Sequence, residues 1–258
     1  TNVAYEREWV KGLNTRLAFD HKRNFSIPTG TTFSTSDAVG DTSVVEEFTT
    51  SEATFNLVWG KGLKFFDSNF GRFPIVSHKP VFTFDYTAGI KGLFNADYNY
   101  HKLQVGMYQR LLGPIGFTVY RAQAGVILGE GTPYPLLNIH DGNESYLYDQ
   151  YAFNAMNESE FISDKWAQLS IVHHFDGFIF DKIPGINKLQ LRSLLTYRVL
   201  YGHVDKKNAE FFNLPEKTNP LNGFYMEAGF GFENILKLLR VDMLFRITQR
   251  DQPNVNKW

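Results

Sequence analysis

The chain has 258 residues, a formal charge of −1 and no cysteine. The lack of cysteine excludes disulfides, thiolate metal sites and cysteine nucleophiles, and the near-neutral charge lacks the basic excess of nucleic-acid-binding proteins. Aromatic residues make up 16 % of the chain, which argues against disorder. No apolar run approaches the roughly 18 residues of a membrane-spanning helix, but a membrane β-barrel stays possible because its strands alternate.

Apolar and polar residues alternate with a period of two along most of the chain, and this pattern predicts β-strands. It is clearest at residues 224–233 and 240–250. Most of the expected strands are about nine to twelve residues long, and a tilted strand of about nine to eleven residues crosses a bilayer. Ten strands are expected, in chain order, at residues 3–10, 13–20, 48–59, 81–88, 102–110, 117–126, 166–175, 189–201, 224–233 and 240–250.

Short and long connections alternate along this series. The short ones are expected at residues 11–12, 113–116, 184–187 and 234–239, and the long ones at 25–47, 89–97, 128–160 and 202–222. Residues 60–79 depart from this alternation, because a short turn is expected there and the segment is long. It holds either extensions of the neighbouring strands or an excursion from the sheet. Short turns at one end and long loops at the other are typical of an up-and-down membrane barrel.

Alternation alone does not show whether the apolar face packs in a protein core or contacts lipid. In a soluble β-sandwich that face is the core, whereas in a membrane barrel it meets lipid. Strand length, loop alternation and aromatic residues near strand ends favour the barrel. The residues expected to face lipid are Leu103, Met107, Leu191, Leu195, Met226, Phe230, Met243, Phe245 and Ile247.

The fold class predicted is therefore all-β, a transmembrane antiparallel up-and-down barrel. We expect residues 1–258 to form one barrel domain that is incomplete at both ends. The direction of the first and last strands requires at least one further strand on each side, and even strand numbers are usual.

Several short segments resemble a Bacteroidetes outer-membrane family of unknown role. They are YERE at 5–8, KGL at 11–13, YAFNAMN at 151–157, EFISD at 160–164, HHFDG at 173–177, LQLR at 189–192, FGFENI at 230–235 and LRVD at 239–242. Members of that family look like a carboxypeptidase-regulatory-like domain followed by a barrel similar to BamA-like assembly and translocation barrels.

The resemblance implies sixteen strands in the whole barrel and a long loop folded into its lumen, here residues 128–160. BamA-like barrels carry a Val-Arg-Gly-aromatic signature in that loop. The nearest segment here, residues 142–146, lacks the Arg-Gly pair, so no insertase or pore mechanism is implied.

Charged residues on the polar face form the first candidate site. They would serve as a polar conduit or as a latch for the long loop, or they would pair with one another across neighbouring strands. We favour pairing, because a buried charge must be either paired or hydrated. This set is Arg110, Arg121, Arg192, Arg198, Glu227, Glu233, Asp242 and Arg246.

The aromatic-rich loop 128–160 is the second candidate site, and its candidate contacts are Gly142, Asn143, Tyr146 and Tyr151. It would act as a plug or a partner-docking surface, or it would pack on the barrel rim with its Gly and Pro residues setting turns. The sequence leaves these alternatives open.

Catalytic, cofactor and metal sites are not expected. His173 and His174 are adjacent on a strand and face opposite ways, so with His140 they make a poor metal site. Ser170 and His174 share a face and could serve a lipid-facing hydrolase, but no orienting acid is evident.

Three functions follow from these patterns. The first is a non-enzymatic outer-membrane protein of envelope biogenesis, or of an outer-membrane protein assembly or export complex. Its partners would be the lipid bilayer with its lipopolysaccharide and other outer-membrane proteins, and not nucleic acid. The alternatives are a soluble all-β glycan-binding module and a lipid-facing outer-membrane hydrolase.

Overall fold

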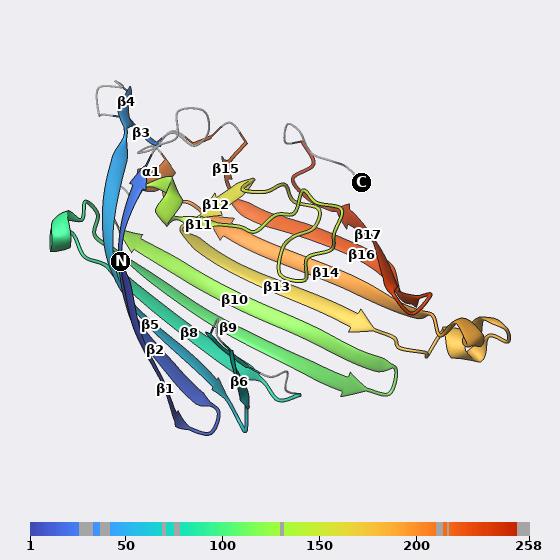
Figure 1. Ribbon diagram of the computed structural model, residues 1–258. Coiled ribbons are helices and arrows are strands. Elements are labelled where there is room, and N and C mark those ends of the chain that lie inside the picture. The colour runs from blue at the N-terminus through green and yellow to red at the C-terminus, as the bar shows by residue number, and fades with distance from the viewer. Residues whose placement is uncertain are drawn as a thin grey trace.

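One large antiparallel sheet dominates the structure, a computed structural model that describes residues 1–25, 33–36, 42–68, 71–74, 78–129, 132–209, 214–215 and 217–251. The sheet is strongly curved and open, with β1 and β17 at its two edges (Figure 1). Its ten strands, in spatial order, are β1 (Asn2–Val10), β2 (Leu13–Phe25), β5 (Glu47–Gly60), β8 (Val81–Gly89), β9 (Tyr100–Gly113), β10 (Gly116–Gly129), β13 (Lys165–His174), β14 (Arg192–His203), β16 (Gly223–Ile235) and β17 (Leu239–Arg246).

All ten strands predicted from the period-two pattern are present, and each pairs antiparallel with the next one in the chain order of the sheet. The prediction of an all-β antiparallel fold is confirmed. Within the described residues β1 and β17 do not pair with each other, so the closed barrel and its sixteen strands stay predictions.

The connections agree with the expected alternation in most places. The tight links between β1 and β2, β9 and β10, and β16 and β17 are confirmed. The expected short turn at 184–187 is wrong, because β13 ends at His174 and β14 begins only at Arg192. The intervening residues form two 3₁₀ turns, η3 (Phe180–Lys182) and η4 (Ile186–Leu189), so the strand expected from residue 189 begins three residues later.

Smaller elements decorate both ends of the sheet. Residues 60–79 prove to be an excursion with its own hairpin, β6 (Phe65–Ser68) and β7 (Gly71–Pro74), and β3 (Phe33–Ser36) pairs with β4 (Thr42–Val45). A small second sheet joins β11 (Asn138–Ile139), β12 (Phe161–Ser163) and β15 (Asn219–Pro220). The remaining elements are η1 (Leu93–Asn95), η2 (Tyr134–Leu136) and α1 (Lys206–Ala209). None of the helices in the described part of the chain is long and apolar enough to span a membrane.

The two faces of the sheet differ sharply in polarity. Cross-strand partners form one row of mostly polar residues on what we call the inner face: Val81, Tyr108, Arg121, Ser170, Arg198, Glu227 and Arg246. The neighbouring residue on each strand belongs to a row on the outer face, and this row is entirely apolar: Trp59, Phe82, Met107, Ala122, Leu169, Val199 and Met226. Successive side chains on a strand point to opposite faces, which separates the two rows.

The residues predicted to form the apolar face do lie on the outer face, except that Leu191 and Ile247 are just beyond strand ends. Much of this face is exposed; Phe230, Met243 and Phe245 are 43, 54 and 39 % accessible. The outer face is thus a broad apolar surface. At these three positions, no other part of the described chain buries it.

The buried core lies instead against the inner face. Residues 132–164, which we call the inner loop, connect β10 to β13 and supply Tyr134, Leu137, Phe153, Met156 and Phe161 to that core. Strand residues complete it, namely Phe48, Ile127, Trp166, Leu200 and Tyr225, together with Ile162 of the inner loop and with Val204 and Leu221 from the connection between β14 and β16. The chain therefore buries apolar surface by folding a long loop back over the polar side of its own sheet (Figure 1).

Candidate functional site

An ion pair on the inner face holds the middle of the inner loop. Arg198 on β14 and Glu227 on β16 are direct cross-strand partners whose Nη1 and Oε1 atoms lie 3.3 Å apart, and both side chains are almost fully buried. Glu227 accepts hydrogen bonds from the backbone N–H groups of Asn154 and Ala155 at 3.1 and 2.9 Å. Arg198 donates to the backbone oxygen of Ala152.

Arg198 uses its remaining donors on the same loop and on the sheet. Its Nη2 donates to the Tyr148 hydroxyl at 2.8 Å, and its Nε donates to Ser170 Oγ at 3.3 Å. The Tyr148 ring also lies 4.0 Å from the guanidinium carbon of Arg240 on β17. Since buried charges are tolerated only when paired and hydrogen-bonded, this network fixes one loop position on the sheet.

A second buried ion pair holds the C-terminal part of the inner loop. Arg246 of β17 donates from Nη1 and Nη2 to the two carboxylate oxygens of Glu160 at 2.9 and 2.7 Å. The rings of Phe161 and Tyr225 lie 5.6 and 5.0 Å from its guanidinium carbon. Such a bidentate pair is both stronger and more directional than a single contact.

A third cluster fixes the point where the loop re-enters the sheet. The Asp164 carboxylate accepts from the Asp205 backbone N–H at 2.6 Å and from the Asn208 amide at 3.0 Å. His140 is buried and its Nε2 lies 2.9 Å from Ser163 Oγ. Burial, helped by the charge of Lys102, lowers the pKa of His140 to about 4, so the ring is neutral near pH 7.

The tip of the loop is ordered by its own side chains. Asn154 Oδ1 accepts from the Asn143 side chain and from the Asp149 backbone N–H, at 2.7 and 2.8 Å. Gly142 passes so close to residue 157 that a Cβ there would lie 1.9 Å from the Asn157 carbonyl oxygen. This frame presents Tyr146 and Leu147 to solvent, with Tyr146 fully exposed.

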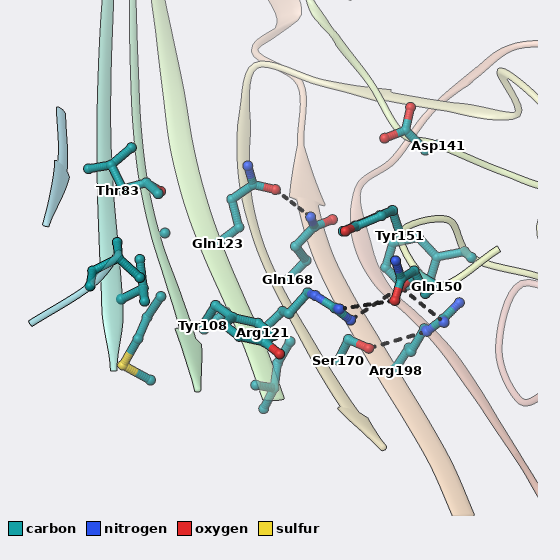
Figure 2. A pocket seen from close by; sticks show the side chains of 18 residues that line it. Thr83, Tyr108, Arg121, Gln123, Asp141, Gln150, Tyr151, Gln168, Ser170 and Arg198 are labelled. Carbon is teal, nitrogen blue, oxygen red and sulfur yellow. Dashed lines mark hydrogen bonds between the residues drawn. The ribbon is translucent and has the colours of Figure 1, made fainter. Parts of the chain in front are cut away.

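A pocket of about 620 Å³ lies between the inner loop and strands β5, β8, β9, β10 and β13. Figure 2 shows Arg121 reaching across it to Gln150, and Gln123 bound to Gln168. The guanidinium of Arg121 lies about 5 Å from the rings of both Tyr108 and Tyr151. The pocket wall therefore combines polar and aromatic side chains with aliphatic ones such as Val58, Leu63 and Leu169.

Of the other predicted charges, Glu233, Asp242 and Arg192 each have an ionisable partner nearby, whereas Arg110 contacts an aromatic ring. Glu233 is 3.0 Å from His174, and Asp242 binds Arg240 twice, at 2.7 and 2.9 Å. Arg192 pairs with Asp176 in a largely exposed contact, and Arg110 lies 3.7 Å from the Phe117 ring. The charged set therefore contains side chains that pair within the sheet, and three of its members, Arg198, Glu227 and Arg246, also bind the inner loop.

Ser170 and His174 do share a face of β13, as expected, but it is not the apolar face considered for a hydrolase. They lie on the polar inner face, where Ser170 contacts Arg198 and His174 contacts Glu233. Four residues along a strand span about 13 Å, beyond the hydrogen-bond reach of a general base. Across the described residues, no three His, Asp or Glu side chains gather as a metal site.

A family model matches residues 2–213: the C-terminal domain of a family of unknown function, DUF5686. The chain belongs to this family. A comparison with curated proteins finds no match.

Among solved structures, the DUF5686 domain is similar to BamA from Haemophilus ducreyi lacking POTRA domains 1–3. The TM-score is 0.54 at 9 % sequence identity, covering 95 % of this chain and 49 % of that one. The chain thus spans about half the length of the BamA structure, and at this identity the likeness speaks for the fold alone. The Bacteroidetes source and the carboxypeptidase-regulatory-like domain stay predictions.

Several residues of the site were not singled out by the sequence. Glu160 and Asn154 stood within segments noted for their resemblance, but nothing in their spacing indicated a partner on β17 or β16. Tyr148 belongs to the aromatic-rich loop but was not among its candidate contacts. The residue segment 151–157 supplies most of the backbone groups that bind Arg198 and Glu227, so the resemblance was the one available signal.

Proposed function

We propose that this DUF5686 domain is a non-enzymatic wall of an outer-membrane β-barrel whose interior is occupied by its own inner loop. One observation carries the proposal: the chain covers the polar face of its sheet and leaves the apolar face uncovered. A loop with many hydrogen-bonding groups lies on Arg198, Glu227 and Arg246, while Phe230, Met243 and Phe245 face away from the molecule.

A water-soluble sheet would be built the other way round. The hydrophobic effect buries apolar area, and monomeric soluble proteins rarely expose apolar patches above a few hundred Å². The outer face meets the opposite requirement, because a bilayer solvates apolar side chains and tolerates charge poorly. This contrast disfavours the soluble glycan-binding module.

For the cellular role we propose envelope biogenesis, as part of a complex that assembles or exports outer-membrane proteins. The BamA-like fold supports this at the level of architecture. The ordered loop tip adds a local argument, since Tyr146 and Leu147 are held exposed by the Asn143–Asn154 frame, as a contact surface requires. The partners would be other outer-membrane proteins and the surrounding lipid with its lipopolysaccharide.

The first experiment separates membrane and soluble states. The full-length protein, expressed at its native level, is expected in the outer-membrane fraction and to require detergent for extraction. Recovery of the folded protein in the detergent-free soluble fraction would overturn the barrel itself.

A second experiment tests the partner role. A photo-crosslinking amino acid replaces Tyr146 at the loop tip, and in the matched control it replaces exposed Phe94 in η1, outside the inner loop. Crosslinked proteins are identified by mass spectrometry after detergent extraction. Specific outer-membrane proteins captured from position 146 and not from 94 would support the role. A protein that needs detergent yet captures nothing from position 146 would leave the barrel standing and remove the assembly role.

A further inference from the structure

The connection between β13 and β14 is ordered although its side chains are largely exposed. Its backbone closes successive turns, with Phe178, Asp181 and Ile183 donating to the carbonyls of Phe175, Gly177 and Phe180 at 2.9–3.2 Å. The segment therefore exposes apolar side chains although its backbone is hydrogen-bonded. These side chains are Phe178, Ile179, Ile183 and Leu189.

This segment lies on the apolar side of the sheet. The Phe180 ring packs against Phe232, with ring centroids 5.9 Å apart, and Phe232 is an outer-face residue of β16. Figure 1 shows the segment as the light-orange coil beyond the tips of β13 and β14, near the β16–β17 turn. The surface is thus continuous with the outer face that we propose to meet lipid.

The β16–β17 turn adjoins the same surface. Asn234 donates from its side chain to the backbone oxygen of Gln190 at 2.8 Å, which ties the two turns together. Leu236 and Leu238 are 76 and 88 % exposed. We call residues 175–191 and 234–238 together the turn-end anchor.

Lysines are interspersed with these apolar residues. Lys182, Lys188 and Lys237 are all exposed, and Lys182 Nζ lies 3.9 Å from the Phe178 ring centroid. Of the two acids in the anchor, Asp176 pairs with Arg192 at 3.2 Å. With three lysines and two aspartates, the anchor carries a net positive charge.

The rest of the same end of the sheet repeats this composition. Exposed Trp9 and Trp59 lie on the outer face near the β1–β2 turn and the end of β5, and exposed Lys11, Lys61 and Lys64 follow them. Amphipathic rings belong at the interface of a bilayer, and lysines there can reach the headgroups.

We infer that the turn-end anchor inserts its apolar side chains into the leaflet at this end of the barrel and that its lysines bind anionic phospholipid headgroups. This inference rests on the proposed membrane barrel. An ordered surface with exposed Phe, Ile and Leu beside Lys is the composition of segments that lie in the interfacial plane, and each lysine near an anionic surface strengthens binding on the order of fivefold.

The test uses the absence of native cysteine. Single cysteines replace Ile179 or Leu189 in the anchor, Phe245 on the outer face, and Tyr146 at the loop tip, in the full-length protein freed of any other cysteine. Each is labelled with an environment-sensitive fluorophore after reconstitution into vesicles of phosphatidylcholine and phosphatidylglycerol. One of the two lipids is brominated near the top of its acyl chains, so that quenching reports contact with that lipid.

We expect strong quenching at positions 179, 189 and 245 and little at 146. At 179 and 189, brominated phosphatidylglycerol should quench more than the brominated neutral lipid. The Lys182→Gln/Lys188→Gln/Lys237→Gln variant should lose this difference, and the matched Lys91→Gln/Lys206→Gln/Lys217→Gln variant at the opposite end should keep it.

The outcomes separate the two proposals. Quenching at 245 without quenching at 179 or 189 would overturn the anchor and leave the barrel intact. Absence of quenching at 245 as well would overturn the membrane barrel and the anchor with it. Equal quenching by the two lipids, unchanged in the triple-lysine variant, would overturn the binding of anionic headgroups.

Discussion

Arg198 and Glu227 face each other directly across β14 and β16, 3.3 Å apart, and each also binds backbone atoms of the inner loop. A pair with this double role links the sheet to the loop. Loss of either member leaves the other charge buried without a partner and frees loop groups that it had bound.

Glu227→Ala should therefore destabilise the folded protein by about 3–5 kcal/mol, because it strands the Arg198 guanidinium in a buried site. Urea titration in detergent micelles, followed by tryptophan fluorescence, measures the free energy of unfolding. The matched control is Glu47→Ala, which removes an exposed partner of Arg23 and should cost at most about 1 kcal/mol. Equal losses in the two variants would mean that the buried pair does not hold the loop.

Arg246→Lys keeps the charge but removes the planar fork that binds both oxygens of Glu160. We expect a loss of about 1.5–3 kcal/mol and faster proteolytic cleavage of the inner loop near residue 157. Arg23→Lys, at an exposed single contact, serves as the control and should change neither quantity measurably. Unchanged loop cleavage in Arg246→Lys would contradict the bidentate anchoring of the loop.

Acidification should loosen the inner loop through His140. Its pKa is about 4 when folded, below the ordinary value of 6.5, because burial disfavours the charged ring. The stability from the neutral ring is complete above pH 6.5 and is lost as the pH falls toward 4, by on the order of 3 kcal/mol in total. Hydrogen exchange of residues 138–163 between pH 7 and 4 measures this, and His140→Gln should flatten the dependence. An equally steep dependence in His140→Gln would assign the effect to another group.

Gly142→Ala should distort the loop because the new Cβ would lie 1.9 Å from the Asn157 carbonyl oxygen, a backbone atom that cannot move freely. We expect a cost of about 1–3 kcal/mol and increased protease sensitivity at the loop tip. At Gly113 the nearest atom would be 3.6 Å away, so Gly113→Ala is a tolerated control. A stable Gly142→Ala variant with an intact tip would argue against the close approach of residues 142 and 157.

Phe245→Arg places a charge on the outer face. If that face meets lipid, the variant should lose about 2–4 kcal/mol of folding free energy in bilayers when the site is near the midplane. Tyr146→Arg, at the exposed loop tip, should be neutral. Folding of both variants into vesicles, followed by resistance to protease, makes the comparison, and full tolerance of Phe245→Arg would reverse the assignment of the faces.

The sequence by itself determined the strands and their two faces. Alternation at a period of two reflects the pleat, a local property of the backbone, so ten strands and the side to which Phe245 or Arg246 points could be predicted without knowing any contact. Two of the three tight turns also stood out through their glycines, at Gly12 and at Gly113 and Gly116. The pattern failed at 184–191, where a short turn and the start of a strand were expected, because short 3₁₀ turns that expose apolar side chains have no clear period.

Only the tertiary structure decided where the loop lies. Arg246 and Glu160 are separated by 86 positions in the chain, and Glu227 meets Asn154 across 73. Such partners are brought together by the curvature of the whole sheet and by the path of the loop over it, and a charge in the sequence carries no mark of its distant partner. The same reason explains why the sequence could not show that the loop covers the polar face of the sheet.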